Sequence, residues 1–93
     1  GGENIASREV EEALRAHPAV VDCAVIGLAD PKWGERACAV LRLGSAVSDE
    51  TLVAHCRSLL AAYKTPKRWI RVDALPLNAA GKVDKPLLRR LYA

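Results

Sequence analysis

Residues 19–43, AVVDCAVIGLADPKWGERACAVLRL, decide the fold, because two apolar runs flank one polar turn. The first run, residues 19–28, is rich in Val and Ile with Asp22 as its one charge, which is typical of a strand. Residues 30–34, DPKWG, have the chemistry of a turn. Residues 36–43 predict the partner strand, with residues 37, 39 and 41 on one face and residues 38, 40 and 42 on the other. Because the connection is short, we expect antiparallel pairing.

A helix is predicted on each side of this strand pair. Upstream, Ser7 is the expected N-cap, and the helix should end near His17 because Pro18 disfavours helical geometry in the residue before it. We expect His17 to be a turn residue or a partner of the helix dipole. Downstream, Ser48 is the expected N-cap of a helix that runs to about Leu60. Near the start of the first helix, negative charge should complement the helix dipole, from Glu9, Glu11 and Glu12. The first helix carries an apolar stripe at helical spacing, formed by Val10, Ala13 and Leu14. The second helix carries another, formed by Leu52, Val53, Cys56, Leu59 and Leu60, and His55 lies off its centre.

The C-terminal third predicts a short strand over residues 69–72, a loop over 73–81, a brief extended piece over 82–84 and a final helix. Pro86 suits the first turn of that helix. Together these elements predict an α+β fold with a small, mainly antiparallel sheet of about three strands and helices packed on it.

Composition indicates one small globular domain of 93 residues, 51% apolar and 27% charged. The sequence has no methionine, so we expect a piece cut from a longer polypeptide whose missing part lies upstream. No run approaches the roughly 18 apolar residues of a membrane span, which favours a cytoplasmic location. The odd number and wide spacing of the cysteines favour reduced, buried thiols over a metal site or a disulfide: Cys23, Cys38 and Cys56.

Charge is unevenly distributed. Residues 47–93 hold nine Lys/Arg against four Asp/Glu, and residues 1–46 hold five against seven. The basic half is where an anionic ligand is expected, although a solvated face is the better explanation for most of these side chains. A small basic module that binds nucleic acid is the alternative from another functional class. Only four aromatic residues are present, and their spacing does not form a stacking platform, so we expect no nucleic-acid partner.

Residues 75–85, LPLNAAGKVDK, place Lys82 behind Gly81 in a polar loop. A lysine ammonium acts as a point charge against phosphate or carboxylate oxygens, and a preceding glycine lets a ligand approach the backbone closely. Lys82 is therefore the candidate catalytic residue. Taken alone, a Gly-Lys pair is equally compatible with an ordinary surface lysine.

Four segments, in order along the whole chain, resemble the C-terminal domain of the adenylate-forming enzymes. They are Gly1-Gly2-Glu3-Asn4-Ile5 with the following Glu9-Val10-Glu11; residues 27–35, GLADPKWGE; residues 63–68, YKTPKR; and Pro76 with Gly81-Lys82. The resemblance is closest to acyl-CoA and aryl-CoA ligases. It implies that residues 1–93 are a single mobile C-terminal domain whose large N-terminal domain, which binds ATP and the acyl group, is absent here. A peptide-synthetase adenylation domain is the alternative, since residues 81–85 also resemble its final motif.

The resemblance also implies site roles. Lys82 matches the lysine that serves adenylation, supported by Pro76 and Gly81. Residues matching the surroundings of the pantetheine arm and of coenzyme A are Gly1, Gly2, Glu3, Asn4, Trp33, Tyr63, Lys64 and Lys67. For Trp33, a role as a lid over the core is an equal alternative. Thr65 departs from the family, in which a further basic residue often occurs at this position.

The resemblance further implies substrates and partners. ATP, which leaves as AMP, and coenzyme A are expected as substrates, with a small carboxylic acid as the third. Mg²⁺ is expected on the missing domain, and we expect no metal site in this chain. In some acyl-CoA synthetases a protein lysine acetyltransferase acylates the lysine that Lys82 matches, which removes its charge.

Overall fold

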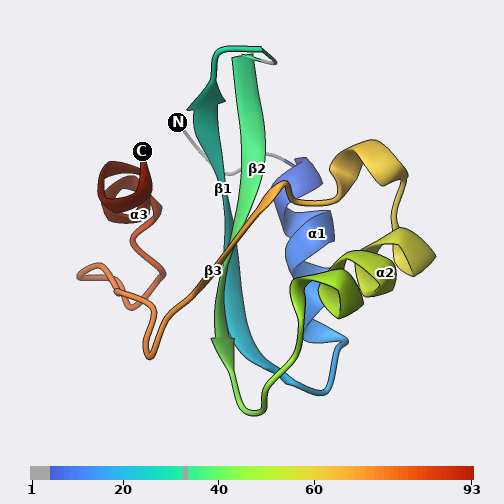
Figure 1. The fold of residues 1–93 in the computed structure, drawn as a ribbon. Helices are drawn as coiled ribbons and strands as arrows, with labels where there is room; N and C mark the ends of the chain where they lie inside the picture. Colours follow the sequence, from blue (N-terminus) through green and yellow to red (C-terminus); the bar gives the residue numbers. More distant parts are fainter. Residues whose placement is uncertain (1–4, 33) are drawn as a thin grey trace.

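The computed structural model describes residues 5–32 and 34–93, with side chains from Ser7 onward. In chain order the elements are α1 (Ile5–Arg15), β1 (Val20–Asp30), β2 (Gly34–Leu43), α2 (Asp49–Leu59), the 3₁₀ helix η1 (Ala62–Lys64), β3 (Arg68–Arg71) and α3 (Lys85–Tyr92) (Figure 1). The α+β class predicted from the sequence is confirmed.

The sheet has three strands in the order β1-β2-β3. β1 and β2 pair antiparallel as predicted, with Ala24 opposite Val40. β3 lies parallel to β2, with Trp69 opposite Ala39, so the sheet is mixed. The parallel pair follows from the connection: the chain leaves the end of β2, crosses through α2 and η1, and re-enters the sheet in the same direction.

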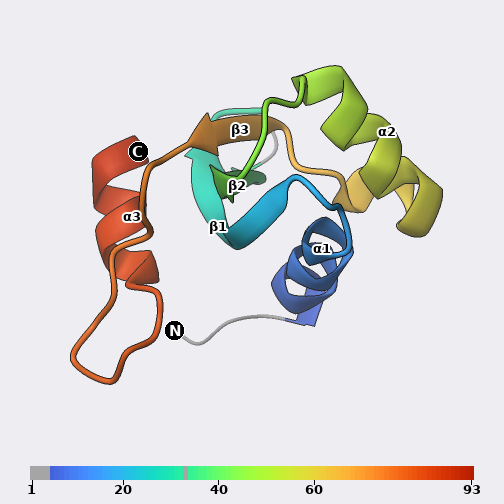
Figure 2. The same cartoon turned by 90° about the horizontal axis from the view of Figure 1, so that it is seen from below.

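Helices cover both faces of the sheet (Figure 2). On one face, Val10 and Leu14 of α1 and Leu52 of α2 pack against Ala39 and Leu41 of β2. On the opposite face, Leu88 of α3 packs with residues of β1 and β2: Ala24, Ile26, Leu28, Cys38 and Val40. The predicted alternation of β2 is confirmed: residues 38–41 are buried because each face has its own helical layer, whereas Ala37 is half-buried and Arg42 is exposed.

Two helix starts agree with the prediction and one does not. Ser48 caps α2 by accepting the Thr51 N–H at 3.1 Å. Pro86 lies in the first turn of α3, whose N-cap is Asp84. The prediction for Ser7 is wrong, because α1 begins at Ile5 and Ser7 lies inside its first turn.

The glutamates of α1 also depart from the prediction, since none falls in the first turn. Glu9 instead bonds to Lys64, and Glu11 bonds to β1 and α3. A helix that starts two residues earlier than Ser7 moves both carboxylates away from the N-terminal dipole and toward neighbouring elements.

The two histidines contact each other and the neighbouring main chain, and the three cysteines are buried. His17 is a turn residue as predicted, and its Nδ1 accepts the Ala19 N–H at 3.0 Å. The His55 ring stacks edge-on against it with centroids 5.0 Å apart, and His55 Nε2 lies 2.6 Å from the Ala13 carbonyl oxygen. All three cysteines are buried free thiols, as predicted. Burial raises the pKa of the Cys23 thiol to about 12, which leaves it protonated and unreactive at neutral pH.

Candidate functional site

The lysine loop, residues 76–84, is a hairpin between β3 and α3. An isolated antiparallel bridge pairs Leu77 with Val83, and the Asp84 N–H donates to the Pro76 carbonyl at 2.8 Å. The Lys85 N–H donates to the Val83 carbonyl at 3.0 Å, and the Asp84 side chain then caps α3. The base of the loop is therefore joined directly to the first turn of a helix.

Asn78 organises the tip of the lysine loop. Its main-chain N–H donates to the Lys82 carbonyl at 2.7 Å, and its carbonyl accepts the Gly81 N–H at 3.0 Å. Its side-chain Oδ1 accepts the Ala80 N–H at 2.9 Å and the Lys82 N–H at 3.1 Å. The main chain of Lys82 is thus held from both sides by one residue.

Gly81 allows this tip to close. Its φ is +79°, in the left-handed region that residues with a Cβ rarely adopt. Within the part of the chain that the structure describes, no atom beyond the adjacent residues lies within 4 Å of where its Cβ would be, so the backbone conformation and not crowding requires glycine here.

Lys82 is exposed. Within residues 5–32 and 34–93, no hydrogen bond or ion pair engages its ammonium group. The loop therefore has a fixed main chain and an available cation, which is the arrangement that a charge aimed at a ligand requires.

The lysine loop faces α1 across an open cavity of about 660 Å³ lined by both elements and by β1. At its floor, Lys85 Nζ lies 2.9 Å from Glu11 Oε2. The same carboxylate oxygen accepts the Val25 N–H of β1 at 2.7 Å. Three elements therefore meet at one buried carboxylate below the loop.

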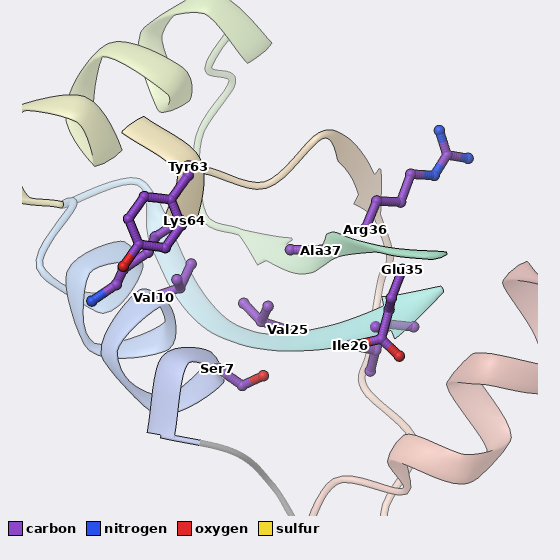
Figure 3. A pocket seen from close by; sticks show the side chains of 10 residues that line it. Ser7, Val10, Val25, Ile26, Glu35, Arg36, Ala37, Tyr63 and Lys64 are labelled. Carbon is purple, nitrogen blue, oxygen red and sulfur yellow. The ribbon is translucent and has the colours of Figure 1, made fainter. Parts of the chain in front are cut away.

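The second candidate region is the η1 face, which we define as residues 62–67 with the adjacent start of β2, residues 35–37. A cavity of about 180 Å³ lies there, with Tyr63 and Lys64 at one end and Glu35 at the other (Figure 3). Tyr63 is 80% exposed, and its ring lies 5.7 Å from Lys64 Nζ. Lys64 Nζ also donates to Glu9 Oε2 at 2.7 Å, and this hydrogen bond raises the pKa of Lys64 above its usual value.

Lys67 lies on the same face with its side chain exposed and its N–H bonded to the Ala37 carbonyl at 2.9 Å. An adjoining cavity of about 300 Å³ is lined by Lys67, Tyr63, Thr65 and Arg36, among others. Thr65 Oγ1 and Arg36 Nε are buried there, and within the described ranges neither has a hydrogen-bond partner. The face therefore offers a ring, cations and an unused hydroxyl next to a cavity.

The structure thus separates the predicted site residues into two groups. Lys82, Gly81 and Pro76 form the lysine loop beside α3, whereas Tyr63, Lys64 and Lys67 form the η1 face next to α1 and α2 (Figures 1 and 2). The remaining predicted residues lie outside the described side chains: Gly1, Gly2, Glu3, Asn4 and Trp33.

Three residues that shape the lysine loop were missed at the level of sequence: Asn78, Glu11 and Lys85. For Asn78 a signal existed, since Asn side chains commonly bond to backbone N–H groups two residues on in turns. For Glu11 and Lys85 no local pattern exists, because they are 74 positions apart and meet only through the fold.

A family model described as the AMP-binding enzyme C-terminal domain matches residues 9–82. The chain belongs to this family. Its lysine loop and η1 face are therefore features of a domain that relatives carry at the end of a longer enzyme.

Curated relatives cover almost all of this chain. The 2-succinylbenzoate–CoA ligase of Bacillus velezensis is 52% identical over 98% of the chain and 19% of that protein. A long-chain-fatty-acid–CoA ligase of Mycobacterium tuberculosis is 43% identical over 100% of the chain and 19% of that protein. The chain spans about one fifth of the length of these relatives.

Solved structures agree with this fold. A fatty acyl-CoA synthetase from Mycobacterium tuberculosis superposes with a TM-score of 0.89 at 43% identity over 99% of this chain and 18% of that chain. An o-succinylbenzoate-CoA synthetase from Bacillus subtilis, in complex with its acyl-adenylate intermediate, gives a TM-score of 0.87 at 43% identity over 96% and 18% of the two chains. The recognition of the family from sequence motifs is confirmed.

Proposed function

We propose that this chain is the C-terminal domain of an AMP-forming acyl- or aryl-CoA ligase. Such an enzyme joins a carboxylate to the α-phosphorus of ATP, which releases pyrophosphate and leaves an acyl adenylate. The thiol of coenzyme A then attacks the acyl carbon and releases AMP. The observation that carries this proposal is an exposed lysine on a hairpin with a fixed main chain, in a domain that matches CoA ligases over nearly its full length.

Lys82 serves the first step in this proposal. A carboxylate and a triphosphate repel each other as they approach, and a cation aimed at their oxygens lowers that cost. The lysine loop suits this role because Asn78 and Gly81 hold the main chain while the ammonium stays unpaired within the described ranges. Preorganised charge of this kind requires little rearrangement during the reaction.

The η1 face serves coenzyme A. Tyr63 offers a ring for stacking and Lys67 a cation for phosphate, while Lys64 is less available because it is paired with Glu9. The resemblance assigns the pantetheine arm to Gly1, Gly2, Glu3 and Asn4, and assigns Trp33 to the surroundings of coenzyme A. These roles require the domain to present different faces in the two steps, since the two regions lie apart in the fold.

The N-terminal domain of the same enzyme would hold ATP, the carboxylic acid and Mg²⁺. Within the described residues no group of three His, Cys, Asp or Glu side chains could hold a metal ion, so we assign no step of this domain to Mg²⁺. None of the described helices has the length and apolar character needed to cross a membrane. A cytoplasmic location and acylation of Lys82 by a protein lysine acetyltransferase are further parts of the proposal, and the exposed ammonium of Lys82 is accessible to such an enzyme.

A different acceptor is a second candidate. A mutant of the amide bond synthetase McbA of Marinactinospora thermotolerans superposes on this chain with a TM-score of 0.87 at 38% identity, over 94% of this chain and 18% of that chain. In that alternative, adenylation by Lys82 is unchanged, and an amine in place of the coenzyme A thiol attacks the adenylate.

The test uses the full-length protein that carries this chain, incubated with ATP and a panel of aliphatic and aromatic carboxylic acids. We expect carboxylate-dependent release of AMP and pyrophosphate, with a thioester formed when coenzyme A is the acceptor. An amide formed with added amines in the absence of thioester would favour the alternative acceptor. Release of ADP, or no carboxylate-dependent AMP with any acid, would contradict the proposal. The isolated 93 residues should be inactive, because the reaction needs the other domain.

A further inference from the structure

We propose that the buried Glu11–Lys85 ion pair positions the lysine loop, so that Glu11 and Lys85 are positioning residues for adenylation. This inference rests on the proposed function, and it assigns a role to residues outside the loop that carries Lys82.

The pair is buried, unlike the other ion pairs of the domain described here. The side chains of Lys85 and Glu11 are 15% and 7% exposed. The side chains of Lys64 and Glu9 are 24% and 42% exposed, and those of Arg71 and Asp49 are 41% and 52% exposed. Because burying two charges costs desolvation, a buried pair contributes little net stability compared with apolar residues of the same size. Its geometric specificity is the property that an apolar contact could not replace.

The geometry joins three elements to the loop. Glu11 extends from the second turn of α1, and its Oε2 atom accepts both the Val25 N–H of β1 and the Lys85 ammonium. Both donors converge on one oxygen that is fixed by the helix and the sheet. Lys85 therefore meets an acceptor whose place is set by the rigid part of the domain.

Lys85 connects this fixed acceptor to the hairpin that carries Lys82. It lies three residues after Lys82, at the point where the hairpin joins α3, and its own N–H bonds to Val83. Asn78 fixes the shape of the tip, whereas the ion pair fixes the whole hairpin relative to α1 and β1. Without the pair, the hairpin would lose its registration on α1 and β1, and the bonds at its tip would open more often.

The test measures two half-reactions of the full-length protein. Carboxylate-dependent exchange of pyrophosphate into ATP reports adenylation, and conversion of supplied acyl adenylate to thioester reports the second step. We expect Lys85→Gln to slow the exchange reaction by about 10- to 100-fold, because small displacements of a catalytic group have effects of this order. Thioester formation should be unchanged, and Lys85→Arg should restore most of the exchange activity because it keeps the charge.

Controls separate positioning from stability. Asp49→Asn removes an exposed ion pair elsewhere and should leave both half-reactions unchanged. Glu11→Gln is the second variant, since its side-chain oxygen can still accept the Val25 N–H while the charge opposite Lys85 is lost. Lys85→Gln and Glu11→Gln are compared with the parent at equal folded fraction. If Lys85→Gln fails to fold, Glu11→Gln decides the outcome.

Amide hydrogen exchange gives a readout that does not depend on activity. The N–H groups of Ala80 and Lys82 should exchange faster in Lys85→Gln than in the parent, whereas those of β2 should not. If the folded variants exchange pyrophosphate at the parent rate, or lose both half-reactions equally, the positioning role is overturned. Absence of pyrophosphate exchange in the parent itself would contradict the proposed function. Amide hydrogen exchange in the loop would still decide whether the pair holds the hairpin.

Discussion

The lysine loop and the η1 face both present lysines at the surface, yet Lys82 and Lys64 are held in opposite ways. In the lysine loop the main chain is held by Asn78 and the Lys82 ammonium is left unpaired within the described ranges. On the η1 face the Lys64 ammonium is already bonded to Glu9. A charge that acts on reacting atoms needs a fixed position and no competing partner, whereas a ligand-binding face can use exposed groups that adjust to the ligand. This contrast supports the proposal that catalysis belongs to the first region and binding to the second.

Among changes that leave Lys82 itself in place, the largest effect on this comparison is expected from Asn78→Ala. The change removes the acceptor for the Ala80 and Lys82 N–H groups, so the tip of the loop loses its side-chain support. We expect the exchange half-reaction of the full-length enzyme to fall by about 10- to 100-fold, with little change in global stability because these bonds are exposed. Asn78→Asp keeps an oxygen acceptor at this position and should retain most of the activity. Equal activity of Asn78→Ala and the parent would show that the loop needs no such support.

Gly81→Ala should have the next largest effect, and the chain supplies a matched control. Gly81 and Gly34 both have φ +79°, and among the described residues no atom beyond the adjacent ones lies within 4 Å of either Cβ position. Each substitution to Ala should therefore destabilise the domain by a similar amount, about 1 kcal/mol, from backbone strain alone. Only Gly81→Ala should slow adenylation, by about tenfold, because only it distorts the residue before Lys82. Chemical denaturation and pyrophosphate exchange measure the two effects, and equal slowing by both variants would remove the distinction between the regions.

Lys67→Ala should have a smaller effect, confined to the second step. Its side chain is exposed, so we expect the KM for coenzyme A to rise by about threefold, the order of a single exposed charge contact. Pyrophosphate exchange should not change. A loss of exchange activity in this variant would place Lys67 in the adenylation machinery and blur the division between the two regions.

The smallest effect is expected from Glu9→Gln, which releases Lys64. The hydrogen bond to Glu9 raises the pKa of Lys64 above 10.5, so its contribution to stability is complete below that pH and is lost as the pH rises through the folded-state pKa. Glu9→Gln should lower the pKa of Lys64 toward 10.5 and remove this alkaline dependence. An NMR titration of the lysine side chain measures the pKa, and an unchanged pKa would show that the ion pair does not hold Lys64 in solution.

Local chemistry made much of the fold predictable. The alternation of β2, the Ser48 cap and the position of Pro86 depend on neighbouring residues, and each is confirmed. The start of α1 was misplaced because Ser7 has the properties of an N-cap without occupying that position. The parallel pairing of β3 depends on the path through α2, which no local pattern in residues 68–72 records.

The candidate site was predictable in part for the same reason. Lys82, Gly81 and Tyr63 belong to continuous motifs and could be singled out from the sequence. The pairing of Lys64 with Glu9 joins residues 55 positions apart, and the support of the lysine loop by Glu11 likewise depends on tertiary contacts. Sequence motifs therefore located the candidate loops, whereas the interactions that hold or occupy their side chains required the fold.

The most direct test of the division between the two regions is Lys82→Ala in the full-length enzyme, with both half-reactions measured. We predict that carboxylate-dependent pyrophosphate exchange falls by about 100-fold or more, while supplied acyl adenylate is still converted to thioester with coenzyme A. If exchange persists at the parent rate, or if thioester formation falls equally, Lys82 is not the adenylation residue and the central claim is wrong.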